Sequence, residues 1–107
     1  MNIGMTIPTR GPLAEPASIK QLAQHAEALG FAYLAVPDHI VVPREIDSRY
    51  PYSASGKFPG STSGSCLDQF GLLSFLAGLT ENPHLLTSVT VIPHRGAVET
   101  AKMVTTL

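Results

Sequence analysis

The chain is short of charge. Only 14% of its 107 residues are Asp, Glu, Lys or Arg, whereas 44% are hydrophobic. An average soluble domain carries about 25% charged residues, so many positions of this chain are expected to face other protein rather than water. The seven basic and eight acidic residues are spread singly and give a net charge of -1. This pattern excludes the basic stripe of a nucleic-acid-binding protein and the polybasic cluster that recognises anionic lipid.

Cysteine and long apolar runs are also scarce. The single cysteine, Cys66, cannot form an internal disulfide, and such usage is typical of a reducing cytoplasm. The first residues, MNIGMTIPTRG, lack the basic start and the long apolar core of a secretory signal. No run reaches the ~20 apolar residues that a membrane-spanning helix requires. We therefore expect a cytoplasmic protein with neither a membrane nor a nucleic acid as partner.

The apolar pattern predicts alternating strands and helices. Strands are expected over residues 2–7, 31–36 and 85–92, and helices over residues 16–29, 67–79 and 97–107. The first helix is expected to bury Ile19, Leu22, Ala23, Ala26 and Leu29. Pro16 suits its first turn, and Gly30 suits a left-handed residue at its end. The continuous apolarity of the second strand is typical of a strand covered on both faces in a parallel sheet.

Residues 37–65 interrupt this alternation with several prolines and a section rich in Ser and Gly. Irregular segments of this length are unusual in compact domains and are often binding loops or lids. A tolerated insertion or a partly disordered stretch would have a similar composition. Tyr50, Tyr52 and Phe58 supply aromatic anchors that a plain linker lacks. The sequence leaves both interpretations open.

Polar residues follow each predicted strand, in segments 8–10, 37–39 and 93–95. The order of elements predicts either an open doubly wound parallel sheet or a closed barrel, and in both the chemistry gathers at the carboxyl ends of the strands. Asp38 and His39 stand at such an end. A histidine there can transfer protons near neutral pH with help from a carboxylate. The alternative is an aspartate that ends the strand and a structural histidine.

The other polar tips carry Arg10, His94 and Arg95. These side chains could bind an anionic group, but arginines at such positions more often form ordinary ion pairs. No two histidines are three or four residues apart and Cys66 has no companion, so the spacing predicts no metal site. A glycine-rich phosphate loop around Lys57 fails, because Pro51 and Phe58 occupy positions that need glycine and a hydroxyl residue.

Several separated blocks resemble one family. They are GFAYLAVPDH (residues 30–39), LAGLTE (76–81), LTSVTVIP (86–93) and Ala101-Lys102. Together they resemble the N-terminal portion of the luciferase-like monooxygenase family, with the greatest likeness to its branch that depends on the deazaflavin coenzyme F420. Residues 46–53 and 56–59 resemble a subset of that branch. The likeness covers essentially the whole chain, and its specificity comes from several blocks in the right order.

The resemblance implies a (β/α)8 TIM-type barrel, of which about three of the eight parallel strands are present. Residues 1–107 would then be a single incomplete barrel segment with a long loop over 37–65, because such a barrel needs ~250 residues. Three parallel strands cannot close a barrel and leave edges unpaired. We therefore expect a fragment, a truncated product or one part of an assembly. A homo-oligomer and a missing carboxyl-terminal portion both stay open, and the isolated chain is expected to be inactive.

The resemblance also implies an oxidoreductase that binds a flavin-type cofactor and a small organic substrate. The reaction would be hydride transfer or monooxygenation, with coenzyme F420 favoured over FMN. His39 matches a catalytic histidine near the reactive ring, acting as a base or a stabiliser, and Asp38 matches an acid that lines the same pocket. Ser88 and Val89 match a bulge with a non-proline cis peptide that supports one face of the ring.

Two positions depart from the family pattern. Leu86 stands where the family usually has glycine, which could crowd the approach to the bulge, and His94 replaces a frequent Tyr or Gln. Two other functions stay open. The chain could be a non-catalytic remnant with an interaction or structural role, or it could derive from another barrel enzyme that acts on sugar phosphates.

Overall fold

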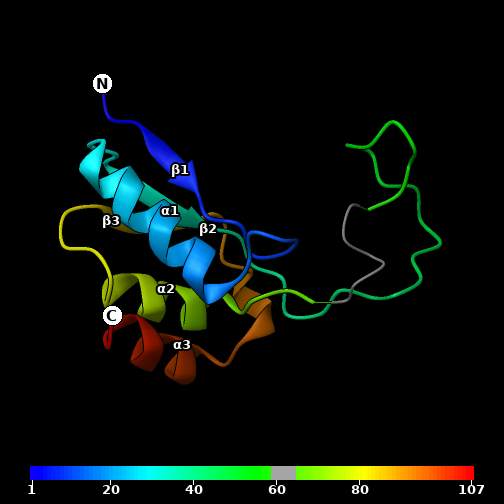
Figure 1. Ribbon diagram of the computed structural model, residues 1–107. Coiled ribbons are helices and arrows are strands. Elements are labelled where there is room, and N and C mark those ends of the chain that lie inside the picture. The colour runs from blue at the N-terminus through cyan, green and yellow to red at the C-terminus, as the bar shows by residue number, and fades with distance from the viewer. Residues whose placement is uncertain (59–64) are drawn as a thin grey trace.

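A computed structural model describes residues 1–58 and 65–107 of the chain. Within these residues, a three-stranded parallel sheet packs against helices (Figure 1). The strands are β1 (Gly4–Thr6), β2 (Tyr33–Val36) and β3 (His84–Thr87), in that order across the sheet. The helices are α1 (Pro16–Ala28), α2 (Gln69–Ala77) and α3 (Ala97–Val104), with a short 3-10 helix η1 (Ile92–His94) before α3. No helix in this part of the chain is long and apolar enough to cross a membrane.

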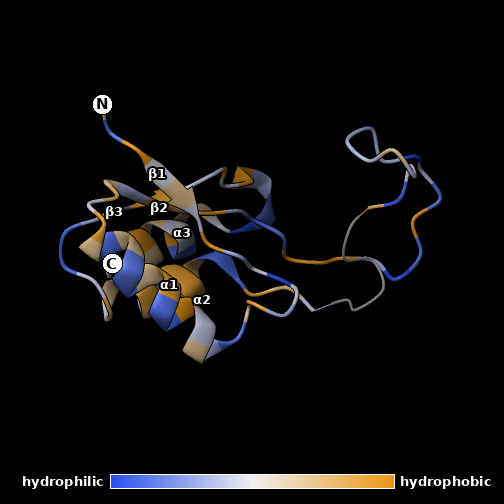
Figure 2. Ribbon diagram, turned by 45° about the horizontal axis from the view of Figure 1, so that its top comes forward, coloured by the Kyte–Doolittle hydropathy of each residue, from blue (hydrophilic) through white to orange (hydrophobic). Residues whose placement is uncertain are grey.

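The core lies between the sheet and the helices. Met5, Leu34 and Leu85 are neighbours in the parallel register, and Leu34 is fully buried. The buried cluster consists of Ile7, Ile19, Ala23, Ala26, Leu34, Val36, Phe70, Leu72, Leu73 and Leu76. In Figure 2 the strongly hydrophobic segments gather where strands and helices meet, whereas much of the long loop is hydrophilic. Burial of this apolar surface is the main stabilising contribution to the unit.

The second face of the sheet carries no helix in the described residues. Thr6, Ala35 and Leu86 are neighbours on it, and Leu86 is 46% exposed. The sequence predicted burial of the second strand on both faces, and Leu34, Ala35 and Val36 are all buried, although the helices lie over one face of the sheet (Figure 1). The parallel α/β arrangement itself is confirmed.

Several predicted boundaries are wrong at their ends. Leu29 is 74% exposed rather than buried, because α1 ends at Ala28 and Leu29 is already its C-cap. Gly30 follows with the predicted left-handed backbone, at φ +78°. The third strand stops at Thr87 instead of continuing to residue 92. The Ser88 N–H still donates to the Val36 carbonyl of β2, but Thr90 and Val91 then bond to the side chains of Gln69 and Asp38.

Glu27 joins α1 to the turn that precedes β3. Its Oε1 accepts hydrogen bonds from the backbone N–H of Glu81 at 2.8 Å and of Asn82 at 2.7 Å. The Asn82 Nδ2 donates to the same oxygen at 3.0 Å. The two backbone N–H groups hold the pKa of Glu27 below its usual value. This carboxylate therefore fixes the entry of β3 relative to α1.

Replacing Glu27 by glutamine is expected to lower the thermal unfolding midpoint at neutral pH, because a neutral amide oxygen accepts N–H groups less strongly than a carboxylate does. Since the folded-state pKa is depressed, the difference is complete above the unfolded pKa of about 4.3 and is lost as the pH falls through the lower folded value. Circular dichroism melts across this pH range measure it. The control is Glu15→Gln, whose side chain makes no cap hydrogen bond. Equal midpoints for Glu27→Gln and wild type at neutral pH would contradict this role.

Candidate functional site

The carboxyl ends of the three strands share one edge of the sheet, as predicted, because all three strands run parallel. Two residues just beyond strand ends, Thr9 and Asp38, are 3% and 7% exposed. The long loop leaves the body from this edge (Figure 1). It returns to the same edge, where the Leu67 N–H donates to the Thr9 carbonyl at 2.8 Å. We call this edge, with the residues that directly follow the strands, the rim.

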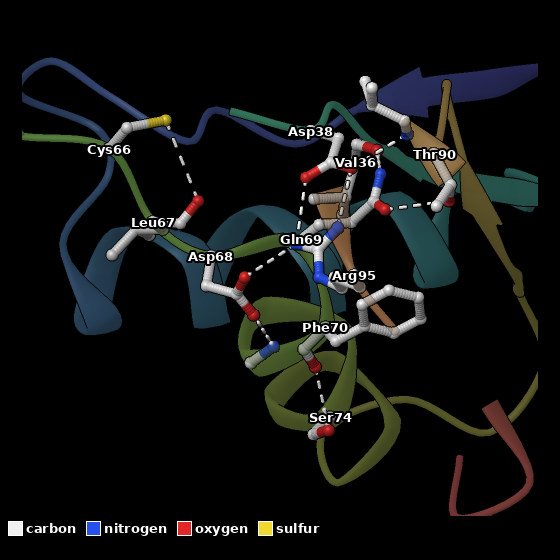
Figure 3. Close-up of polar contacts among 12 residues, drawn as sticks. Val36, Asp38, Cys66, Leu67, Asp68, Gln69, Phe70, Ser74, Thr90 and Arg95 are labelled. Atoms are coloured by element: carbon white, nitrogen blue, oxygen red, sulfur yellow. Dashed lines mark hydrogen bonds and ion pairs between the residues drawn. The ribbon is translucent and has the colours of Figure 1, made fainter. Parts of the chain in front are cut away.

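A buried ion pair joins two of the rim segments (Figure 3). Arg95 Nη1 donates to Asp38 Oδ2 at 2.8 Å, and Arg95 Nη2 donates to Asp38 Oδ1 at 3.0 Å. The side chains of Asp38 and Arg95 are 1% and 9% exposed. Nη2 also donates to Asp68 at 2.9 Å, and the guanidinium lies 5.0 Å from the Phe70 ring centroid. Of the two roles considered for Arg95, the structure shows the ion pair.

Asp38 makes a third contact, because its Oδ2 accepts the Val91 N–H at 3.0 Å. The hydrogen bond from Arg95 is the main cause that holds the pKa of Asp38 below its usual value, against the opposing effect of burial. The same pairing raises the pKa of Arg95. Both groups therefore stay charged across the physiological range. Asp38 joins the end of β2 to the segment after β3, while direct cofactor contact by its carboxylate stays a prediction.

Gln69 is a site residue that the sequence analysis missed. It is fully buried at the start of α2. Its Nε2 donates to the Val36 carbonyl at 2.7 Å and to the Val89 carbonyl at 3.2 Å, while its Oε1 accepts the Thr90 hydroxyl at 2.9 Å (Figure 3). A glutamine beside a helix start gives no signal in a single sequence, because it reads as a surface residue. In the fold it joins β2, α2 and the segment after β3.

The segment after β3, Ser88–Val89, which we call the bulge, contains the non-proline cis peptide that the resemblance implied. The peptide bond between Ser88 and Val89 is cis. The Ser88 N–H donates to the Val36 carbonyl at 2.9 Å, which is also an acceptor of Gln69. Val89 is 71% exposed. The bulge therefore presents an apolar side chain at the rim while its backbone is held against β2.

His39 lies at the rim with its ring against the long loop. Its centroid is 5.6 Å from that of Phe58, in an edge-to-face arrangement. Burial is the main cause that lowers the pKa of His39, and the charge of Arg10 adds to it, while Asp38 opposes it. A lowered pKa favours the neutral imidazole, which can accept a proton.

The aromatic anchors of the loop contact one another and the rim. Tyr50 lies 5.0 Å from Phe58 and 5.6 Å from Tyr52, both edge-to-face. The Arg10 guanidinium lies 4.6 Å from the Phe58 ring centroid. The Tyr50 N–H donates to the Gly56 carbonyl at 2.7 Å, so residues 50–56 form a closed turn. The loop is thus attached to the rim at Phe58, and residues 59–64 lie outside the described part of the chain.

The remaining candidates make no hydrogen bond or ion pair to this cluster among the described residues. His94 is exposed in η1, where its charge helps to lower the pKa of Asp38, and His84 packs beside Tyr33 near the opposite edge, with ring centroids 5.7 Å apart. The Cys66 thiol is half-buried and contacts the Leu67 carbonyl at 3.8 Å. The rim cluster therefore consists of Arg10, Asp38 and His39, the Ser88–Val89 bulge, and their supports.

Comparison with known proteins shows the family. The family model for luciferase-like monooxygenases matches residues 1–107, and the chain belongs to this family. An uncharacterized protein of Mycobacterium bovis is 32% identical over 81 residues, which is 76% of this chain and 28% of that protein. Uncharacterized proteins from two strains of Mycobacterium tuberculosis match to the same extent. No solved structure matches the chain significantly. The matched part thus spans about a quarter of these relatives' length.

Removing the arginine of the buried pair is expected to destabilise the protein far more than removing its exposed partner. Arg95→Met leaves Asp38 charged and buried, which costs about 3 kcal/mol or more. Asp68→Asn keeps an acceptor for the N-cap bond to Gly71. It removes only an ion pair whose carboxylate side chain is 56% exposed, worth less than about 1 kcal/mol. Urea unfolding of both variants measures the difference.

The pH dependence separates this ion pair from general packing. Because the folded pKa of Asp38 is depressed, the stabilisation is present above its unfolded pKa of about 3.9 and is lost as the pH falls through the folded value. The difference in the free energy of unfolding between wild type and Arg95→Met should therefore become smaller at acidic pH. Equal losses of unfolding free energy in Arg95→Met and Asp68→Asn at neutral pH would show that the buried pair stabilises the fold no more than the exposed pair does.

Proposed function

We propose that this chain provides the amino-terminal part of the active site of a flavin- or deazaflavin-dependent oxidoreductase. The reaction is hydride transfer to or from a small organic substrate, or its monooxygenation. The observation that carries the proposal is that hydrogen bonds to β2 and α2 hold the Ser88–Val89 segment on the same rim as His39, in a chain of the luciferase-like monooxygenase family. We favour coenzyme F420 over FMN, because residues 46–53 resemble the deazaflavin-dependent branch.

The rim offers apolar contact to a planar ring. Val89 is 71% exposed on the bulge, and a ring system would cover it. Leu86, inside β3 on the second face of the sheet, is 46% exposed, so it would also border a ligand that extends over this face. Two hydrogen bonds hold the backbone of the Ser88–Val89 segment, one from the Gln69 side chain to the Val89 carbonyl and one from the Ser88 N–H to the Val36 carbonyl. Such a support suits a surface that must keep its position when a ligand packs on it.

His39 is the proposed proton-handling residue. The bound cofactor would supply the electron or hydride chemistry, while the protein contributes position and electrostatics. The lowered pKa of His39 favours its neutral imidazole, so it can take a proton from a substrate hydroxyl or stabilise a neighbouring group by a hydrogen bond. The Asp38 carboxylate, next to His39 in the chain, accepts hydrogen bonds from the Val91 N–H and from Arg95. These bonds fix the backbone at His39.

A non-catalytic role is the second candidate. One face of the sheet is uncovered in the described residues, and the chain spans about a quarter of the length of the curated relatives it matches. A unit of this kind could serve as a structural or interaction module. In that case catalysis, substrate binding and partner binding would belong to the whole protein and not to this unit alone.

Titration of the chain with the deazaflavin cofactor, and separately with FMN, tests the proposal by fluorescence and visible absorbance. We expect saturable binding that is tighter for the deazaflavin. His39→Ala should weaken it roughly tenfold, the loss of about 1.4 kcal/mol of contact. His25→Ala is the control, because this exposed histidine lies on α1 and bonds only within its own helix. Absence of saturable binding, or equal binding by His39→Ala and wild type, would favour the non-catalytic role.

A further inference from the structure

Arg10 follows β1 at the rim, and its guanidinium has an unmet hydrogen-bonding group. The Nη1 atom is shielded from solvent and has no hydrogen-bond partner among the described residues. One side of the guanidinium faces the Phe58 ring at 4.6 Å from its centroid. The other rim arginine differs, because Arg95 is bound by both Asp38 and Asp68. Arg10 thus has a cation–π contact but no acceptor for this N–H.

A buried guanidinium N–H without an acceptor is costly, since it has lost its hydrogen bonds to water and gained none. An aromatic ring satisfies the charge in part but does not replace an oxygen acceptor. Carboxylate and phosphate oxygens are the partners that a guanidinium fork matches best. No carboxylate in the described part of the chain lies within ion-pair distance of Arg10. An anionic ligand bound at the rim would supply the missing acceptor.

The surroundings of Arg10 place such a ligand beside His39. Phe58 contacts both residues, with its centroid 5.6 Å from the His39 ring centroid. The Leu67 N–H donates to the carbonyl of Thr9, directly before Arg10, so both ends of the long loop lie at this point of the rim. Aromatic and backbone contacts thus hold Arg10 where a group bound to it would meet the imidazole.

We propose that Arg10 binds an anionic oxygen, from a carboxylate or phosphate group, of the organic substrate that meets His39. The proposal deepens the proposed function and rests on it for the identity of that substrate. The order of the strands in the sheet favours the substrate, rather than the cofactor, as the source of the anionic group at Arg10. The bulge that would support the cofactor ring follows β3, His39 follows the central β2, and Arg10 follows β1 on the far side. A molecule that contacts both Arg10 and His39 therefore lies across from the ring support.

The electrostatic coupling between Arg10 and His39 provides a direct readout. The positive charge of Arg10 contributes to the lowered pKa of His39, together with burial and against the charge of Asp38. An anion bound at Arg10 compensates that positive charge, so it should raise the pKa of His39. Removing the charge of Arg10 should raise the pKa of His39 without any ligand.

NMR titration of the His39 ring in the full chain, with acetate and with inorganic phosphate as probes, tests the proposal. In wild type we expect each probe to raise the pKa of His39 saturably. In Arg10→Met the pKa of His39 should start higher and should not respond, with probe affinity at least about tenfold weaker, as expected for a lost charged hydrogen bond. Arg44→Met is the control, because this exposed loop arginine makes no such contact. Equal responses in Arg10→Met and wild type would overturn the proposal.

Arg10→Lys keeps the test valid if Arg10→Met does not fold. It preserves the charge but loses the planar fork, so the pKa of His39 should stay low in the free protein while phosphate binds more weakly than in wild type. Amide spectra establish that each variant is folded. Phosphate affinity equal to that of wild type in folded Arg10→Lys would overturn the role of the guanidinium.

Cofactor titrations separate the two sources of the anion. The deazaflavin cofactor and its phosphate-free chromophore are compared in wild type and Arg10→Met. Unchanged affinity for both, with loss of the acetate and phosphate responses, supports a substrate anion. Weaker binding of the cofactor alone would assign the anion to the cofactor's own phosphate and overturn the substrate assignment. If neither form binds even in wild type, the proposed function fails, while the anion titration still decides the role of Arg10.

Discussion

The rim depends on one interaction, the buried pair between Asp38 and Arg95. Two N–H···O contacts of 2.8 and 3.0 Å join a residue that follows β2 to a residue that follows η1. A third hydrogen bond, from the Val91 N–H to Asp38, fixes the segment between β3 and η1. Neither charge could stay buried without the other, because an unpaired ion in such a place is strongly destabilising. The position of His39, next to Asp38, is therefore set by a contact with the far end of the β3 connection.

Residues at the start of α2 bond to this pair and to the segments beside it. Asp68 caps the helix through the Gly71 N–H and also binds Arg95. The next residue, Gln69, bonds to both sides of the gap between β2 and the bulge. Two consecutive side chains of one helix terminus thus hold the two halves of the rim. The long loop, by contrast, contacts the rim through Phe58, whose ring lies against His39 and Arg10.

Much of this architecture could be predicted from sequence periodicity. The strand and helix order, the left-handed Gly30 and the parallel rim follow from local patterns that the fold obeys. The end of the third strand could not be predicted, since Thr90 and Val91 have strand-like side chains but bond to Gln69 and Asp38. The strand ends early because of contacts between residues that are 21 and 53 positions apart in the sequence, and no local pattern contains such contacts.

The same reason explains what was missed at the site. The sequence identified Asp38 and His39 as a pair at a strand end, and the resemblance placed a cis peptide at Ser88–Val89, which the structure has. The buried role of Gln69 and the contrast between Arg10 and Arg95 needed coordinates. Both arginines follow strand ends in the sequence, yet only Arg95 has carboxylate partners among the described residues. The difference lies in which side chains the tertiary fold brings near each guanidinium.

A cofactor ring that packs on the bulge beside His39 is tested most directly by intermolecular NOEs in the chain with bound deazaflavin. The expected result is a set of NOEs from ring protons to the Val89 methyl groups and to the His39 imidazole, weakened when Arg95→Met releases Asp38. NOEs to Tyr33 and His84 at the opposite edge, with none to Val89 or His39, would contradict the placement of the site at the rim.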